Sequence, residues 1–263
     1  MPKAQRGGTD TYWRSWGDAP AKVLLIHCSL GHSGAWKGFA PLLGKPCVAF
    51  DLPGHGQSGP LVKGVDFHAQ ATAVAADFLG DAPIDVIGHS FGATVALRQA
   101  MENPAHVRRL VLIEPVLMCA ANGSKVLAAY DADFAPFIAA MKAGEPLRAA
   151  EIFTSIWGAG VDWADMREGQ RQGLADQIHI IPAEDPAIYG DNAGLLRVGW
   201  LEATDMPVLL LEGSDSPPVI GAIADGLAAR LPNVTREVLP GMGHMAPLTH
   251  PVEVAKVVRG FLA

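Results

Sequence analysis

A serine in a glycine-rich turn is the residue of this sequence most able to act as a nucleophile. Ser90 lies at the centre of the pentapeptide GHSFG (88–92), which reads G-x-S-x-G. The apolar, β-branched residues 84–87 precede it, and residues 91–102, rich in good helix formers, follow it. A tight strand-to-helix turn of this kind strains the backbone of its serine and exposes the hydroxyl above the edge of the sheet. The pattern therefore predicts a nucleophilic role for Ser90.

The segments around this turn alternate between two kinds of pattern. Apolar, β-branched runs typical of strands lie at 9–16, 22–27, 46–50, 84–87, 109–113, 207–211 and 234–239. Helical patterns lie at 35–43, 65–79, 91–102, 219–231 and 251–261. Strands that alternate with helices at this spacing form βαβ units. The sequence therefore predicts an α/β fold with a mostly parallel central sheet of about eight strands, flanked by helices.

The alternation is interrupted in the middle of the chain. Residues 116–205 contain no convincing strand, but helical patterns occur at 125–142, 147–156 and 162–177, with several aromatic residues among them. We interpret residues 116–205 as a helical cap, inserted after the sixth strand and lying over the edge of the sheet. Residues 1–115 and 206–263 then form the core domain.

Composition and charge restrict the class of protein. The 263 residues are 49% hydrophobic, enough for a large buried core, and the net charge of −7 with scattered basic residues argues against nucleic acid as a partner. The three cysteines have no metal-like spacing, which favours a reducing, cytoplasmic location. The first 17 residues lack an apolar signal core, and no run is long enough to span a membrane. We expect a monomer or homodimer.

From Lys22 onward, the sequence resembles the α/β-hydrolase-fold enzymes, in particular the branch of esterase-like enzymes with a serine nucleophile. Four motifs carry this resemblance: His27 with its small-residue loop, DLPGHGQS (51–58), GHSFG (88–92) and G-x-G-H-x-x-P (241–247). The resemblance implies a catalytic triad of serine, acid and histidine in that chain order, with no metal and no organic cofactor.

A serine hydroxyl needs a general base within hydrogen-bond reach. Among the nine histidines, His244 lies in a glycine-rich loop directly after the last predicted strand, where the family places its base. His89 is next to Ser90 but points away from the pocket if Ser90 points in, so we expect a structural role for it. His27 and His55 lie in loops that are expected to brace the site.

Two carboxylates are candidates for the acid. In the family the acid usually follows the penultimate strand in a loop written G-x-x-D, but this loop reads Gly213-Ser214-Asp215-Ser216, with the aspartate one position early. A second location in the family is the end of the strand that follows the elbow helix, where this chain has Glu114. The register favours Glu114, and Asp215 remains the alternative.

The developing oxyanion needs two backbone N–H donors. Phe91, directly after the nucleophile, would supply one. The family commonly writes H-G-x after the first central strand, with x as the second donor, and this position is Ser29. Cys28 stands where glycine is usual in that motif. A packing role fits Cys28 better than a reactive one, because no second base is evident near it in the sequence.

The residues and the resemblance together predict a hydrolase acting on ester bonds. A serine nucleophile argues against the dehalogenase and epoxide-hydrolase branches, which use aspartate. We expect cleavage of a carboxylic ester, or a related acyl bond, of a small to medium, fairly apolar substrate through an acyl-enzyme on Ser90. Hydrolysis of a C–C bond (meta-cleavage type) or of a lactone is an alternative. A non-catalytic ligand sensor on the same fold is an alternative from another class.

Overall fold

The computed structural model describes residues 2–263, and its centre is a single sheet of eight strands. The strands are β1 (Lys3–Arg6), β2 (Thr9–Trp16), β3 (Val23–Ile26), β4 (Cys47–Phe50), β5 (Ile84–His89), β6 (Val107–Ile113), β7 (Val208–Gly213) and β8 (Val234–Leu239). Their order in the sheet is β1-β2-β4-β3-β5-β6-β7-β8. β1 and β2 form an antiparallel hairpin at one edge, β2 pairs antiparallel with β4, and all later pairs are parallel. The predicted mostly parallel α/β sheet is therefore confirmed.

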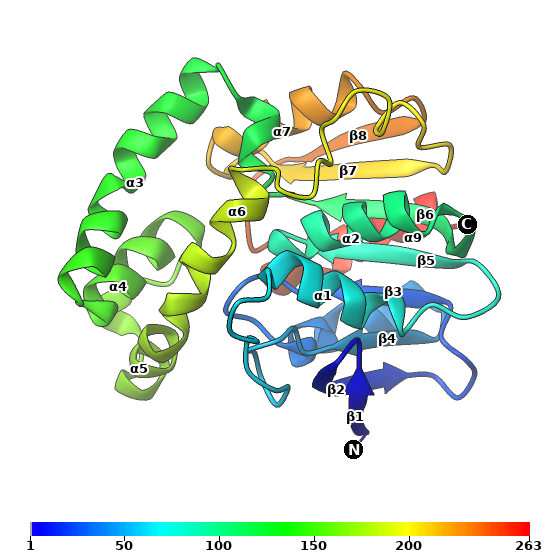
Figure 1. Ribbon diagram of the computed structural model, residues 1–263, viewed down its shortest axis with the longest axis horizontal. Coiled ribbons are helices and arrows are strands. Elements are labelled where there is room, and N and C mark those ends of the chain that lie inside the picture. The colour runs from blue at the N-terminus through cyan, green and yellow to red at the C-terminus, as the bar shows by residue number, and fades with distance from the viewer. Residues whose placement is uncertain (1) are drawn as a thin grey trace.

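Helices cover both faces of this sheet (Figure 1). They are α1 (Phe67–Ala76), α2 (Phe91–Glu102), α7 (Val219–Ala228), α8 (Ala246–Thr249) and α9 (Pro251–Phe261). Alternate residues of β3 enter different clusters of the core: Leu24 packs with α1, α2 and α7, whereas Val23 packs with α9. Because successive side chains of a strand point to opposite faces, a strand buried on both faces must be apolar throughout.

Two predicted helices differ from the observed ones. Residues 35–43 form two short 3₁₀ helices, η1 (Ser33–Gly38) and η2 (Ala40–Leu43), rather than one amphipathic α-helix. Pro41 has no N–H to donate to an earlier turn, so the chain restarts there with proline at the beginning of η2. The helix predicted over 162–177 begins only at Glu168.

The chain between β6 and β7 forms helices and no strand in the described structure. They are η4 (Met118–Ala121), α3 (Lys125–Ala143), α4 (Pro146–Trp157), η5 (Trp163–Asp165), α5 (Glu168–Gln177), η6 (Ile178–Ala183) and α6 (Asp185–Ile188). Helices α3 to α6 lie together beside one end of the sheet (Figure 1). The assignment of residues 116–205 as a separate cap domain stays a prediction. No helix within residues 2–263 is both long and apolar enough to cross a bilayer.

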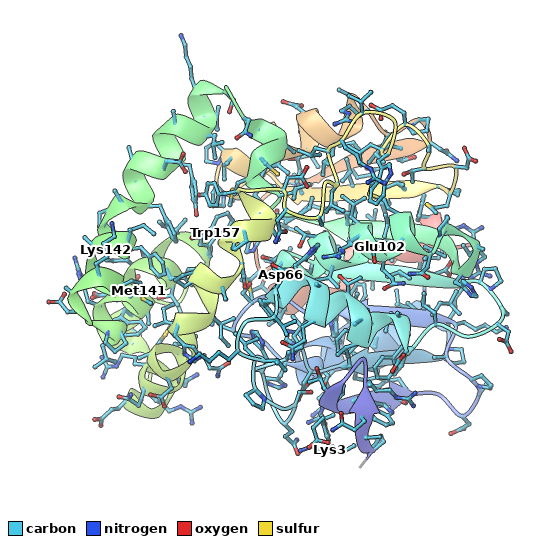
Figure 2. The ribbon with its side chains drawn as sticks, in the orientation of Figure 1. Lys3, Asp66, Glu102, Met141, Lys142 and Trp157 are labelled. Carbon is cyan, nitrogen blue, oxygen red and sulfur yellow. The ribbon has the colours of Figure 1, made fainter. Side chains whose placement is uncertain are left out.

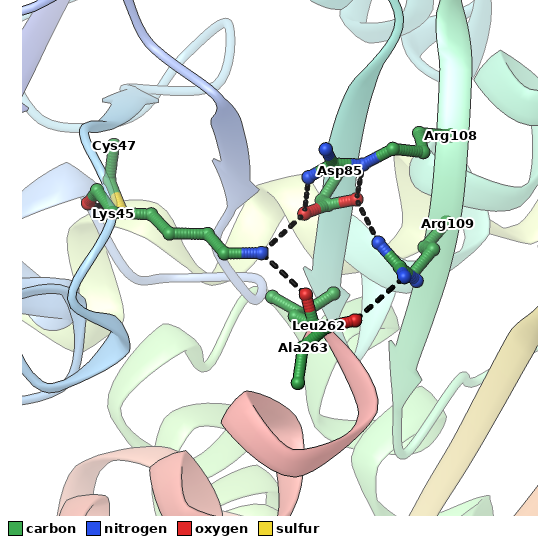
Figure 3. A network of polar contacts seen from close by, with 7 residues as sticks. All are labelled: Lys45, Cys47, Asp85, Arg108, Arg109, Leu262 and Ala263. Atoms are coloured by element: carbon green, nitrogen blue, oxygen red, sulfur yellow. Dashed lines mark hydrogen bonds and ion pairs between the residues drawn. The ribbon is translucent and has the colours of Figure 1, made fainter.

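A buried carboxylate holds the opposite end of the sheet together (Figure 3). Asp85, near the start of β5, is fully buried and forms a bidentate ion pair with Arg108 of β6. Lys45 lies 3.5 Å from the same carboxylate and donates to the carbonyl oxygen of Leu262 at 2.5 Å. Arg109 donates to the carbonyl oxygen of Ala263 at 2.8 Å. The network therefore joins two central strands to the C-terminus of the chain.

We expect Asp85→Ala to lower the free energy of unfolding by about 1–3 kcal/mol, because it leaves three clustered cations without their buried counter-charge. Urea unfolding would measure the loss. Arg148→Ala is the control, since it removes an exposed pair with Glu151 and should change stability very little. Equal, small losses in both variants would contradict a structural role for the network.

Candidate active site

Ser90 lies on a strained turn between β5 and α2. Its backbone has φ 57° and ψ −122°, in a region that residues with a side chain rarely adopt. A Cβ atom on Gly88 would lie 2.2 Å from the carbonyl oxygen of Gly92, and one on Gly92 would lie 2.4 Å from that of His27. Both positions therefore require glycine. The Ser90 N–H donates to the carbonyl oxygen of Ile113 at 2.9 Å and ties the turn to the end of β6.

His244, in the loop after β8, is bound to the carboxylate of Glu114. The distance from His244 Nδ1 to Glu114 Oε2 is 2.6 Å, and both side chains are almost fully buried. Oε1 of Glu114 accepts hydrogen bonds from the Gly213 N–H at 2.6 Å and from the Ser216 hydroxyl at 2.5 Å. With Nδ1 held in this way, Nε2 is the nitrogen of His244 that is left for proton transfer.

The Glu114 carboxylate is held in its charged form. Burial by itself raises the pKa of Glu114, but hydrogen bonding and electrostatic attraction to His244, with the bonds from Ser216 and Gly213, outweigh burial and lower the pKa below its usual range. Glu114 also has a positive φ of 49° directly after the last residue of β6. Its side chain is therefore aimed by a strained backbone and fixed by three partners.

Asp215, the alternative acid, lies apart from the histidine ring. It is exposed, and its Oδ1 accepts a hydrogen bond from the hydroxyl of its neighbour Ser214 at 2.8 Å. Ser216, at the position where the family usually carries its acid, instead donates to Glu114. The structure therefore brings His244 to Glu114 and leaves Asp215 at the surface of the loop.

Three buried histidines brace the loops of the site. His89 Nε2 lies 2.9 Å from the carbonyl oxygen of His244, so the residue before the nucleophile holds the backbone of the candidate base. Burial, followed by the nearby His244, lowers the pKa of His89 to about 3, so its ring is neutral. His27 accepts from the Leu52 N–H at 2.9 Å, and His55 accepts from the Leu30 N–H at 3.0 Å.

The two candidate oxyanion donors are the residue that follows Ser90 and a residue that lines the same cavity. Phe91 is the first residue of α2, where the backbone N–H has no partner within the helix. Ser29 follows β3 in a loop whose next residue, Leu30, has a positive φ of 57° and is held through its N–H by His55. Ser29 and Ser90 line the same cavity. Cys28 is buried, and burial raises the pKa of its thiol to about 12, which makes it unreactive.

Ser90 opens into a small, mainly apolar cavity of about 40 Å³. Its lining comes from the two serines, the segment after β6 and the helices α3, α4 and α6: Ser29, Ser90, Val116, Met118, Tyr130, Phe134, Phe153, Trp157, Ile181, Glu184, Asp185, Ile188 and Tyr189. His244 lines a separate cavity of about 550 Å³. In the present arrangement the Ser90 cavity holds no more than a few water molecules.

Trp157 connects the helical region, formed by α3 to α6, to His244. This side chain lies where the helices meet the α/β core (Figure 2). Its ring packs edge-on against His244 with centroids 4.7 Å apart, and its Nε1–H donates to the Tyr130 hydroxyl at 3.2 Å. No local pattern in the sequence assigns Trp157, Ser216 or the buried Glu184 to the site, because each becomes part of it only through residues distant in the chain. Within residues 2–263, no three histidine, cysteine or acidic side chains are grouped as a metal site.

Comparisons with known proteins identify a family and relatives of this chain. A family model described as "Alpha/beta hydrolase family" matches residues 23–257. The chain is 31% identical to lipase LipV of Mycobacterium tuberculosis, over 92% of this chain and 94% of that protein. It is 30% identical to a pimeloyl-[acyl-carrier protein] methyl ester esterase of Neisseria meningitidis, over 95% of both. A solved structure of a thermophilic esterase superposes with a TM-score of 0.71 at 23% identity, covering 99% of this chain and 96% of that one, and shows likeness of fold.

The two carboxylates can be told apart by matched substitutions. We expect Glu114→Gln to lower kcat for p-nitrophenyl acetate by about 10²–10⁴-fold, because the amide neither stabilises an imidazolium nor fixes the tautomer of His244. Asp215→Asn should leave kcat within about twofold, since Asp215 does not contact the ring. The opposite ranking in steady-state kinetics would assign the acid to Asp215.

Proposed function

Because the chain belongs to the alpha/beta hydrolase family, we propose that it is a serine hydrolase that cleaves carboxylic esters through an acyl-enzyme on Ser90. The observation that carries this proposal is the buried contact of 2.6 Å between Glu114 and His244, together with the strained turn of Ser90, whose preceding residue His89 contacts the backbone of His244. The names of the relatives, a lipase and a methyl ester esterase, support the ester as the bond that is cleaved.

The proposed reaction has two halves, acylation of Ser90 and hydrolysis of the acyl-enzyme. His244 Nε2 takes the proton of Ser90 Oγ as this oxygen attacks the ester carbonyl, and the N–H groups of Phe91 and Ser29 stabilise the negative oxygen. The Glu114 carboxylate stabilises the resulting imidazolium. The imidazolium then gives its proton to the departing alcohol, which leaves an acyl group on Ser90. Water, deprotonated by His244, releases the acid and restores the serine.

The lining of the Ser90 cavity supports a fairly apolar acyl group, and its volume of about 40 Å³ supports a small one. Most of its lining is aliphatic or aromatic, and in the present arrangement it is too small for a longer chain. Longer acyl groups would need displacement of the helices that close it. We propose a reducing, cytoplasmic setting, which is supported by three buried cysteines that are all free thiols.

Ser90→Ala tests the nucleophile. A fluorophosphonate probe should label the wild-type protein on Ser90 and leave the variant unlabelled, and hydrolysis of p-nitrophenyl acetate should fall by about 10⁴-fold or more. Retained labelling or hydrolysis would overturn the proposal. Strong labelling with very slow turnover of every simple ester would direct the search toward a C–C hydrolase, a lactonase or a ligand sensor.

Trp157→Ala tests what limits the size of the acyl group. Removing the indole enlarges a cavity of only about 40 Å³, so kcat/KM should move in favour of p-nitrophenyl octanoate over the acetate by about tenfold. Trp163→Ala is the matched control, because Trp163 lines the wide cavity instead. An unchanged ester ranking in Trp157→Ala, or the same change in the control, would contradict this assignment.

A further inference from the structure

Glu184 brings a buried carboxyl group from the helical region to the Ser90 cavity. It lies between η6 and α6, and only 3% of its surface is exposed. Its Oε1 accepts a hydrogen bond from the Ser29 hydroxyl at 2.5 Å, a contact that joins residues 155 positions apart. Glu184, Ser29 and Ser90 line the same cavity. The carboxyl therefore lies against the loop that we expect to supply one of the two oxyanion donors.

No positive charge compensates this carboxyl in the described structure. No lysine, arginine or histidine is among the described residues that line the cavity. The titratable groups that face it are Cys28 from the loop after β3, Tyr130 from α3, and Asp185 beside it in the chain. Each of these groups is neutral or negative, so none of them stabilises a carboxylate. Such a site therefore favours the protonated, uncharged form of the acid.

The electrostatic environment agrees with this geometry. Burial raises the pKa of Glu184 to about 8, against the lowering effect of the Ser29 hydrogen bond and with a small upward contribution from Asp185. Burial also raises the pKa of Asp185. At neutral pH most Glu184 side chains are therefore uncharged carboxylic acids, and they become carboxylates in mildly alkaline solution.

We propose that Glu184 is a positioning residue of the Ser90 site, whose carboxyl group holds the Ser29 loop through the Ser29 hydroxyl and whose ionised form opposes ester hydrolysis. This inference rests on the proposed function. An oxyanion stabilised by the Ser29 N–H develops in the same small, poorly solvated cavity as the Glu184 carboxyl. A carboxylate there repels the developing charge, whereas the neutral acid does not. The hydrogen bond between Ser29 and Glu184 also couples the position of the helical region to that of the Ser29 loop.

The test is the alkaline side of the pH profile of kcat/KM, measured with p-nitrophenyl acetate from about pH 6 to about pH 10 and corrected for spontaneous hydrolysis. Wild-type activity should fall above about pH 8, approaching tenfold per pH unit if the ionised form is inactive. Glu184→Gln keeps a neutral group of the same shape and should lose this fall. Asp185→Asn is the matched control. It should keep the fall, at a slightly lower pH, because Asp185 lines the cavity without contacting Ser29 but its charge contributes to raising the pKa of Glu184.

Ser29→Ala provides a second test that does not depend on folding of the Glu184 variant. It keeps the backbone N–H but removes the hydrogen bond that lowers the pKa of Glu184, so the alkaline fall should move to higher pH. An alkaline limb that is unchanged in both Glu184→Gln and Ser29→Ala would overturn the inference. If Ser90→Ala abolishes hydrolysis in the same assay, an unchanged alkaline limb overturns only the inference about Glu184. If Ser90→Ala retains hydrolysis, the proposed function itself is overturned.

Discussion

The contact between Glu114 and His244 is the interaction on which the site depends. It joins the end of β6 to the loop after β8, so it exists only if β6, β7 and β8 pair in the observed register. Gly213 at the end of β7 makes this approach possible, since a Cβ atom there would lie 2.0 Å from the carbonyl oxygen of Met242. Its N–H also donates to Glu114. The pairing of these strands therefore sets the distance between Glu114 and His244.

Backbone strain is concentrated at this same edge. Within residues 2–263, four non-glycine residues have a positive φ, and three of them are Leu30, Ser90 and Glu114. Such conformations cost about 1–3 kcal/mol each and persist only where the surroundings determine them. Here the surroundings are parallel strands buried on both faces, together with histidines whose ring nitrogens hold the loops. The Asp85 network contributes rigidity at the far end of the sheet.

The helical region encloses the site. Trp157 contacts the ring of His244, the candidate base, and Glu184 contacts Ser29, the candidate oxyanion donor. The same helices close the Ser90 cavity to about 40 Å³. Exclusion of water strengthens every electrostatic interaction in such a cavity, including the unfavourable ones. A neutral acid is compatible with that environment, whereas a carboxylate near an oxyanion is not.

Local patterns in the sequence were sufficient to predict β2 to β8, the turn at Ser90 and a mostly parallel sheet of about eight strands, because these depend on neighbouring residues and on burial of both faces of the sheet. They did not predict β1, the short edge strand. The same patterns predicted an α-helix over 35–43 where Pro41 divides two 3₁₀ helices. The acid partner of His244 could not be chosen from spacing alone, since both Glu114 and Asp215 follow strands that end at the same edge. That choice, the burial of Glu184 and the small cavity at Ser90 were decided by tertiary packing, because each depends on the distance between residues that only the folded sheet and its helices bring together.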